Sequence, residues 1–276
     1  MLVVGSAISQ GFSLPFLHCM VLRQAESAMI DRWELRSPLD KSVRVITLTL
    51  RVQGIGGFWR GFIPKVLLSI PHFYLTRGIK TILYIQKMPR DGFFEWYIAR
   101  LLSSVMVDSL STLMIYPIDC AWTIYTCDMH SKHHSLFGCF LSLARAEGLL
   151  GLYHGFGTTL ASLFLYRAVT ILLAYIIFGK FHRTKHPPVG SVGVSLGGQL
   201  ITYPLEVIRR SQMLAIGSNL SCGEVTSRIV HRSGARELFG GYLVSLVPSF
   251  IASVGPLCFD RVASYCLDKF FSILSP

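Results

Sequence analysis

The stretch TYPLEVIRR, residues 202–210, decides the fold of this chain. It lies in an apolar segment of helix length, yet it contains a proline, Pro204, followed by an acid, Glu206, and a base, Arg209. A proline inside a helix removes one backbone hydrogen bond and kinks the helix. The segment therefore indicates a kinked helix that carries an acid and a base just beyond the bend.

Related motifs recur along the chain in a fixed order. The proline motif has counterparts in SLPFLHCMVLRQ, around Pro15, and in IYPIDCAWTIYT, around Pro117. Each is followed by a glycine-rich motif, which reads QGIGGFWRG, EGLLGLYHG and SGARELFGG in turn. Two motifs that recur three times in the same order predict internal repeats. We expect a single domain over 1–276 with repeats at about 1–90, 91–185 and 186–276.

The composition is that of a membrane protein. The chain has 276 residues, of which 51% are hydrophobic and 15% charged, whereas soluble domains are about 25% charged. Its net charge of +11 fits loops that face anionic lipid. No basic run interleaved with aromatics appears, so we expect no nucleic-acid partner. Apolar stretches near the 20 or so residues that cross a bilayer lie at about 1–22, 62–85, 96–127, 156–180, 189–214 and 242–271.

Metal and enzyme chemistry have little support in the sequence. None of the seven cysteines forms a CxxC pair, and no nucleophile–base arrangement stands out. We therefore expect no metal site, no catalytic residues and no cofactor. The glycine-rich motifs allow the chain to turn and to begin a helix with exposed N–H groups, which suit a phosphate.

These motifs resemble those of the mitochondrial carrier family over essentially the whole chain. TYPLEVIRR matches the family's Pro-x-acid-x-x-base motif, and GLYHGFGTTLASLFLYRA, residues 151–168, looks like the second repeat of ADP/ATP carriers. The resemblance implies an all-α bundle of six transmembrane helices with threefold pseudosymmetry and short matrix helices. It also implies a multi-pass protein of the mitochondrial inner membrane.

The resemblance further implies bound cardiolipin, with the lipid phosphates at the N-termini of the matrix helices and of the even-numbered spans. We expect Arg60 to reach a lipid head group. The corresponding glycines in this sequence are Gly54, Gly61, Gly148, Gly155, Gly234 and Gly241.

The chain departs from the family at the matrix gate, where the acid of one repeat pairs with the base of the next. Only one of the three pairs keeps both charges, Asp119 with Arg209. Glu206 has lost its base, and Gln24, which matches a glutamine that braces a gate pair, stands beside that incomplete pair. We expect the remaining corner to be apolar. We call the gate residues Leu17, Met20, Asp119, Trp122, Glu206 and Arg209.

The even-numbered spans have lost charges as well. In the family they carry an aromatic-acid-x-x-base motif, but here the aligned positions are Thr81 and Tyr84, Tyr175 and Phe178, and Asp260 with Ala263. The substrate contact points carry no cation, although phosphates require paired charge. This disfavours ADP/ATP exchange. These contact points are Leu68–Ser69, Ser162–Leu163 and Pro248–Ser249.

Asp108 falls in the middle of a span, where a lone carboxylate is costly. It could form a proton or cation site, or it could bond to a neighbouring helix, and we favour the second interpretation. Lys65 and Arg167 are its candidate partners, and these residues with Ser162 are the candidate cavity residues. On the helix of the third gate segment, Arg209 is expected to face the gate and Arg210 to point away from it.

Two functions follow from these departures. We favour a structural or accessory role with little or no transport, for example as a subunit of a respiratory-chain assembly. The alternative is a transporter of a small, weakly charged metabolite that works by alternating access. Membrane lipid, cardiolipin and a large membrane protein complex are the expected partners.

Overall fold

The computed structural model describes most of the chain. The described residues are 2–31, 42–62, 65–66, 74–76, 78–79, 81, 92–129, 132, 135–178, 188–215, 220–251 and 254. Several predictions on the even-numbered spans lie outside them, as do the proposed repeat boundaries near 90 and 185. The positions concerned are Leu68–Ser69, Tyr84, Asp260 and Ala263.

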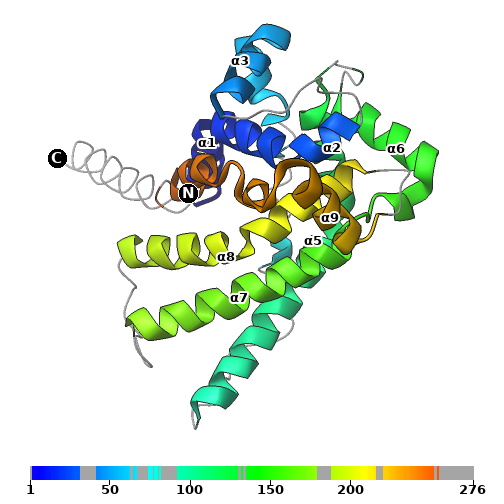
Figure 1. Cartoon of the computed structure of the whole chain (residues 1–276). Helices are drawn as coiled ribbons and strands as arrows, with labels where there is room; N and C mark the ends of the chain where they lie inside the picture. The colour runs from blue at the N-terminus through cyan, green and yellow to red at the C-terminus, as the bar shows by residue number, and fades with distance from the viewer. Residues whose placement is uncertain are drawn as a thin grey trace, which may run out of the picture.

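Four long helices form the body of the structure, and all regular structure in the described residues is helical. They are α1 (Leu2–Gln24), α5 (Phe93–Cys127), α7 (Phe156–Phe178) and α8 (Pro188–Leu214). The three predicted prolines lie inside α1, α5 and α8. Helices α7 and α8 run side by side, and α5 packs against α7 (Figure 1).

Helices α5 and α7 are long and apolar enough to cross a membrane, judged by the residues that the structure describes. At 35 residues, α5 is about 52 Å long at 1.5 Å per residue, so it exceeds the hydrocarbon core of about 30 Å. The residues described in the predicted second and sixth spans, among them 74–76 and 242–251, are also helical. The predicted all-α carrier architecture agrees with these elements, and the number of spans stays a prediction.

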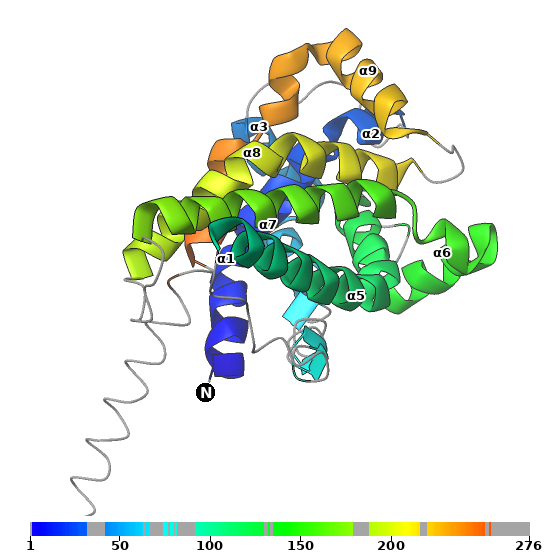
Figure 2. The ribbon, with the colours of Figure 1, turned by 90° about the horizontal axis from the view of Figure 1, so that it is seen from below.

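Short helices connect the long ones. After α1 come α2 (Glu26–Asp31), α3 (Ser42–Val52) and a 3₁₀ turn, η1 (Ile55–Trp59). Helix α6 (Leu136–Gly151) follows α5, and α9 (Cys222–Ser233) with η2 (Ala235–Phe239) follows α8 (Figure 2). The start of α9 is fixed by a capping box, in which Ser221 and Glu224 each bond to the other's backbone N–H.

The predicted glycines hold the turns of the three repeats. All six have a positive φ, between 70° and 85°, in the left-handed region that side chains with a Cβ avoid. Gly61, Gly155 and Gly241 each begin a helix, because their carbonyls accept the N–H of the residue four positions later, at 3.0, 3.0 and 3.1 Å. Backbone N–H groups at such helix starts suit an anion, while cardiolipin binding at these glycines stays a prediction.

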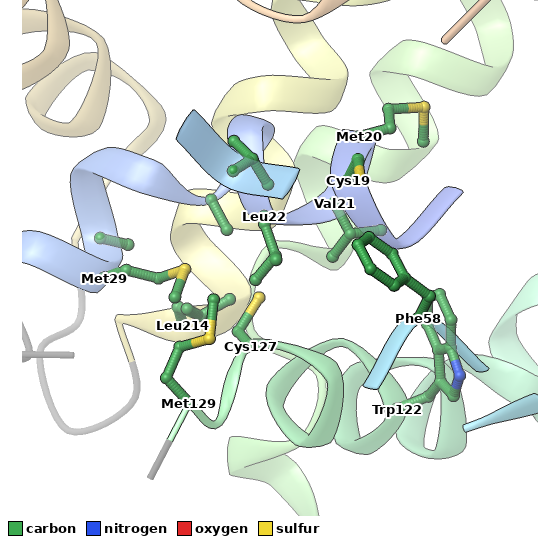
Figure 3. Packing of buried hydrophobic residues seen from close by; sticks show 13 residues of the cluster. Cys19, Met20, Val21, Leu22, Met29, Phe58, Trp122, Cys127, Met129 and Leu214 are labelled. Atoms are coloured by element: carbon green, nitrogen blue, oxygen red, sulfur yellow. The ribbon is translucent and has the colours of Figure 1, made fainter. Parts of the chain in front are cut away.

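Among the described residues, the hydrophobic core consists of three clusters that follow the repeats. One joins α5 to α6 around Tyr116, and another joins α8 to α9 around Tyr203. The third, which we call the first-repeat cluster, also takes in the end of α5. In Figure 3, Trp122 lies next to Phe58, whose ring points towards α1. The cluster consists of Cys19, Met20, Val21, Leu22, Ala25, Ala28, Met29, Val45, Phe58, Trp122, Cys127, Met129 and Leu214.

Candidate functional site: a matrix gate divided into charged and apolar halves

Half of the gate residues form a charged network between α5, α7 and α8. Arg209 Nη1 lies 3.6 Å from Asp119 Oδ2, so the structure brings together the one pair expected to keep both charges. Arg209 Nη2 also lies 3.3 Å from Glu206 Oε2. Ser162 of α7 donates to Glu206 Oε1 at 3.4 Å. Glu206, which has lost its partner on α1, is therefore held by its own helix and by α7.

Lys65 supplies a second cation to this network. Its Nζ lies 3.1 Å from Asp119 Oδ1, whereas the sequence suggested it as a partner for Asp108. Asp119 therefore has a cation on each carboxylate oxygen, Lys65 on Oδ1 and Arg209 on Oδ2. With Glu206, two acids and two bases form a charge-balanced chain.

The other half of the gate is apolar. Met20 and Trp122 belong to the first-repeat cluster, and Leu17 packs against it. Trp122 is 1% exposed, and its Nε1 donates to the Gly61 carbonyl at 3.2 Å. The expectation of a purely apolar corner needs correction, however, because Lys65 Nζ lies 4.2 Å from the centre of the Trp122 ring.

Asp108 and Arg167 form an ion pair that joins α5 to α7. The Asp108 side chain is 12% exposed and that of Arg167 37%. Of the two candidate partners, the structure thus selects Arg167. Nearby, Tyr97 donates to the Ala168 carbonyl at 3.0 Å, which ties the same two helices together.

The prediction that Arg60 reaches a lipid head group needs correction. Its side chain is 12% exposed and turns inward, where Nη1 donates to the Asp128 carbonyl at 2.7 Å. Its guanidinium carbon lies 4.5 Å from the centre of the Tyr125 ring. The physical reason is that the last carbonyls of α5 have no partner within the helix, and an arginine satisfies them well.

Two of the predicted polar positions are deeply buried. Gln24 is 3% exposed, and its Oε1 has no hydrogen-bond donor among the described residues. Arg210, expected to point away from the gate, is 6% exposed. The bracing role of Gln24 stays a prediction.

Sequence reasoning missed a set of ties between neighbouring repeats. Gln212 lies against Gly155, where an added Cβ would come within 3.1 Å of the Gln212 Cβ, and it accepts from Thr158 at 2.6 Å. Arg23 lies against Gly241 in the same way and pairs with Glu237 at 2.7 Å. Each follows its helix proline by eight residues. This shared spacing is the sequence signal from which both contacts could have been predicted.

An aromatic cluster stands where the charged motif of the second repeat is missing. Tyr175 of α7 lies 4.3 Å from Phe93 and 6.0 Å from Trp96, measured between ring centres. Phe93 and Trp96 belong to the first turn of α5. Tilted ring contacts between the two helices thus lie at the position of the missing charged motif.

Comparisons with known proteins match this architecture. The family model described as mitochondrial carrier protein matches residues 95–185. ADP,ATP carrier protein 2, mitochondrial, of Arabidopsis thaliana is 26% identical and covers 96% of this chain and 74% of its own length. ADP,ATP carrier protein 1 of Saccharomyces cerevisiae is 26% identical over 86% of this chain and 83% of its own. The ADP,ATP carrier protein of Schizosaccharomyces pombe is 26% identical, and the alignment covers 97% of this chain and 89% of that protein.

The matched segment contains nearly all of α5 together with α6 and α7, and therefore two gate residues, Asp119 and Trp122. The longer alignments to the carriers extend the similarity to nearly all of the chain. The predicted localisation, as a multi-pass protein of the mitochondrial inner membrane, agrees with these relatives. Together these matches support the assignment of the chain to the mitochondrial carrier family.

Proposed function

We propose that this carrier-family protein has a structural or accessory role in the inner membrane and carries out little or no metabolite transport. The observation that carries the proposal is the apolar half of the matrix gate. There, Trp122 is buried in the first-repeat cluster together with Met20, and neither position carries a charge.

Alternating access requires gate contacts that form and break at comparable free energy. Ion pairs can exchange partners or take up water when a gate opens. The apolar side chains of the first-repeat cluster have no alternative partners of this kind. Separating α1 from α5 would expose Met20 and Trp122 to the aqueous cavity. Burial stabilises a large apolar side chain by about 1.5–3 kcal/mol, so a gate sealed by several of them favours the closed state.

Three of the cations between the helices are engaged with acids. Lys65 and Arg209 share Asp119, and Arg167 pairs with Asp108. A phosphate-bearing substrate needs cations that are available to it. At the contact points that the structure describes, Ser162 bonds to Glu206, and Ser249 donates to Gln199 at 2.6 Å. These contacts argue against ADP/ATP exchange by this chain.

The proposed partners are cardiolipin and a large membrane protein complex. Large apolar side chains on the outer faces of α5 and α7 fit either lipid or a partner helix. Among the strongly exposed ones are Met106, Leu102 and Met114 on α5 and Ile176 and Ile177 on α7.

One observation favours the alternative function, a transporter of a small, weakly charged metabolite. The Asp108–Arg167 pair lies between α5 and α7, and Arg167 remains 37% exposed. A partly exposed ion pair within a helix bundle could bind a polar solute that exchanges with one of its partners.

The two functions are separated by transport assays on the purified full chain in cardiolipin-containing liposomes. The proposal predicts no saturable uptake from a panel of radiolabelled nucleotides, carboxylates and amino acids. Saturable exchange that Arg167→Ala abolishes and Arg228→Ala preserves would defeat it, since Arg228 is an exposed arginine on α9. Native electrophoresis of gently solubilised mitochondria should place the 30.8 kDa chain in a band of much higher mass.

A further inference from the structure

We propose that Lys65 is the relocated cation of the matrix gate, and that it clamps the second span to α5 through Asp119 and Trp122. In the gate motif the base belongs at the position of Trp122, on the third span. Here the cation comes from the neighbouring helix instead. The inference rests on the proposed function and deepens it, because it identifies a cation that adds to the apolar packing of the closed gate.

The start of the second span positions Lys65. The Gly61 carbonyl accepts the Lys65 N–H at 3.0 Å, so the two residues lie one helical turn apart on the same face. Trp122 covers this turn. Its Nε1 donates to the same Gly61 carbonyl at 3.2 Å, and the Lys65 ammonium lies 4.2 Å from the ring centre.

Gly61 makes this close approach feasible. A Cβ at this position would lie 2.7 Å from Trp122 Nε1, closer than such atoms approach. Its φ of 83° is also in the region that glycine favours. Glycine at 61 and tryptophan at 122 are thus complementary, and together they leave the ring face open to Lys65.

The ammonium of Lys65 is held by two attractions at once. It lies 3.1 Å from Asp119 Oδ1, and it faces the negative face of an indole, which is the preferred ring for a cation. Its side chain is 31% exposed, so water can complete its hydration. Asp119 in turn bonds to Arg209, and Arg209 to Glu206, so one chain of charges links the second span, α5 and α8.

A second contact supports the pairing of these two helices. Thr76, further along the second span, donates to Ser111 of α5 at 3.1 Å. Lys65 is therefore a positioning residue at one end of a helix pair that is also joined near its middle. If Lys65 lost its charge, Asp119 would still pair with Arg209, but the second span would lose its ionic link to α5.

The test uses the full chain in cardiolipin nanodiscs with Trp122 as the remaining tryptophan, after Trp33, Trp59 and Trp96 are changed to Phe. Acrylamide quenching then reports the accessibility of Trp122. We expect Lys65→Met to raise the quenching constant at least twofold and Lys65→Arg to restore it to near the parent value. Arg145→Met, which removes an exposed positive charge on α6, is the matched control and should leave quenching unchanged.

Asp119→Asn should reproduce the effect, and the double variant with Lys65→Met should add little to it. A role of Lys65 in packing alone would give additive effects and no rescue by arginine. Equal quenching constants in Lys65→Met and Lys65→Arg would overturn the clamp. If the methionine variant does not fold, Lys65→Gln takes its place in the same comparison. Uptake by the unmodified chain would defeat the proposed function and leave the clamp standing, so the two failures are distinguishable.

Discussion

Trp122 donates its indole N–H to the carbonyl of Gly61, 3.2 Å away, at the position where the family motif has a base. This bond joins α5 to the start of the second span and places an aromatic ring inside the gate. The missing charge is thus replaced by a side chain with its own buried partners. The residues of the predicted gate are divided, with hydrophobic packing on the side of α1 and ion pairs on the side of α8.

Substitutions at Trp122 should show that position 122 now requires an aromatic ring. Trp122→Phe keeps the ring and loses one hydrogen bond, so we expect a loss of about 1 kcal/mol in the free energy of unfolding. Trp122→Arg restores the family's residue type but buries a cation beside Lys65 with no new acid, so we expect a loss of about 3 kcal/mol or more. Thermal unfolding in detergent measures both.

Trp59→Phe is the control for these variants, because Trp59 is 46% exposed and should tolerate the change. A Trp122→Arg protein as stable as the parent would mean that the apolar half of the gate is not a stabilising feature.

The glycines that begin the even-numbered spans should not tolerate alanine. In Gly155→Ala, φ of 77° and a Cβ 3.1 Å from Gln212 both oppose the substitution. We expect a loss of about 1–3 kcal/mol in unfolding free energy, from backbone strain and overpacking. Gly157, two residues later, is the matched control, because nothing lies within 4 Å of its added Cβ.

Gly157→Ala is expected to be neutral or stabilising by up to about 1 kcal/mol, since alanine is the better helix former. The melting temperature should therefore fall in Gly155→Ala and stay level or rise in Gly157→Ala, and equal shifts would argue against the positioning of Gly155.

The Asp108–Arg167 pair should show coupling in a double-mutant cycle. Arg167→Met leaves a carboxylate that is 12% exposed without its partner, and we expect a loss of about 2–4 kcal/mol. Adding Asp108→Asn removes the uncompensated charge and should recover more than half of that loss. The cycle is read from unfolding midpoints of the single and double variants. Additive losses would indicate that the two side chains do not interact.

The aromatic cluster at the opposite end should depend on the ring of Tyr175. Tyr175→Phe preserves the ring that lies 4.3 Å from that of Phe93, so its melting temperature should stay near the parent value. Tyr175→Ala removes contacts with both Phe93 and Trp96 and should cost about 1–3 kcal/mol. Comparable stabilities of the alanine and phenylalanine variants would exclude a stabilising role for the cluster.

The backbone features of this protein were predictable from sequence because proline and glycine act locally. Pro117 lies inside a helix, as its motif predicts, and Gly155 has the positive φ that its turn requires. The Asp119–Arg209 contact was predictable from the resemblance to carriers, in which the acid of one repeat pairs with the base of the next.

The partners of the long basic side chains were not predictable in this way. Lys65 could reach Asp108 or Asp119 as far as spacing shows, and the rotation of the second span against α5 decides between them. Arg60 turns inward because the end of α5 offers carbonyls that need donors. Such choices depend on how neighbouring helices are turned, and the one-dimensional pattern does not contain that information.

The native cysteines offer the most direct test of the claim that the apolar half of the gate stays shut. Cys19 and Cys127 are buried in the first-repeat cluster, and Cys222 on α9 is exposed. The full chain in cardiolipin nanodiscs is treated with a polar maleimide, and labelling is followed peptide by peptide by mass spectrometry. We predict that Cys222 reacts at least about 100-fold faster than the other two, and labelling of Cys19 and Cys127 within tenfold of Cys222 would contradict the account.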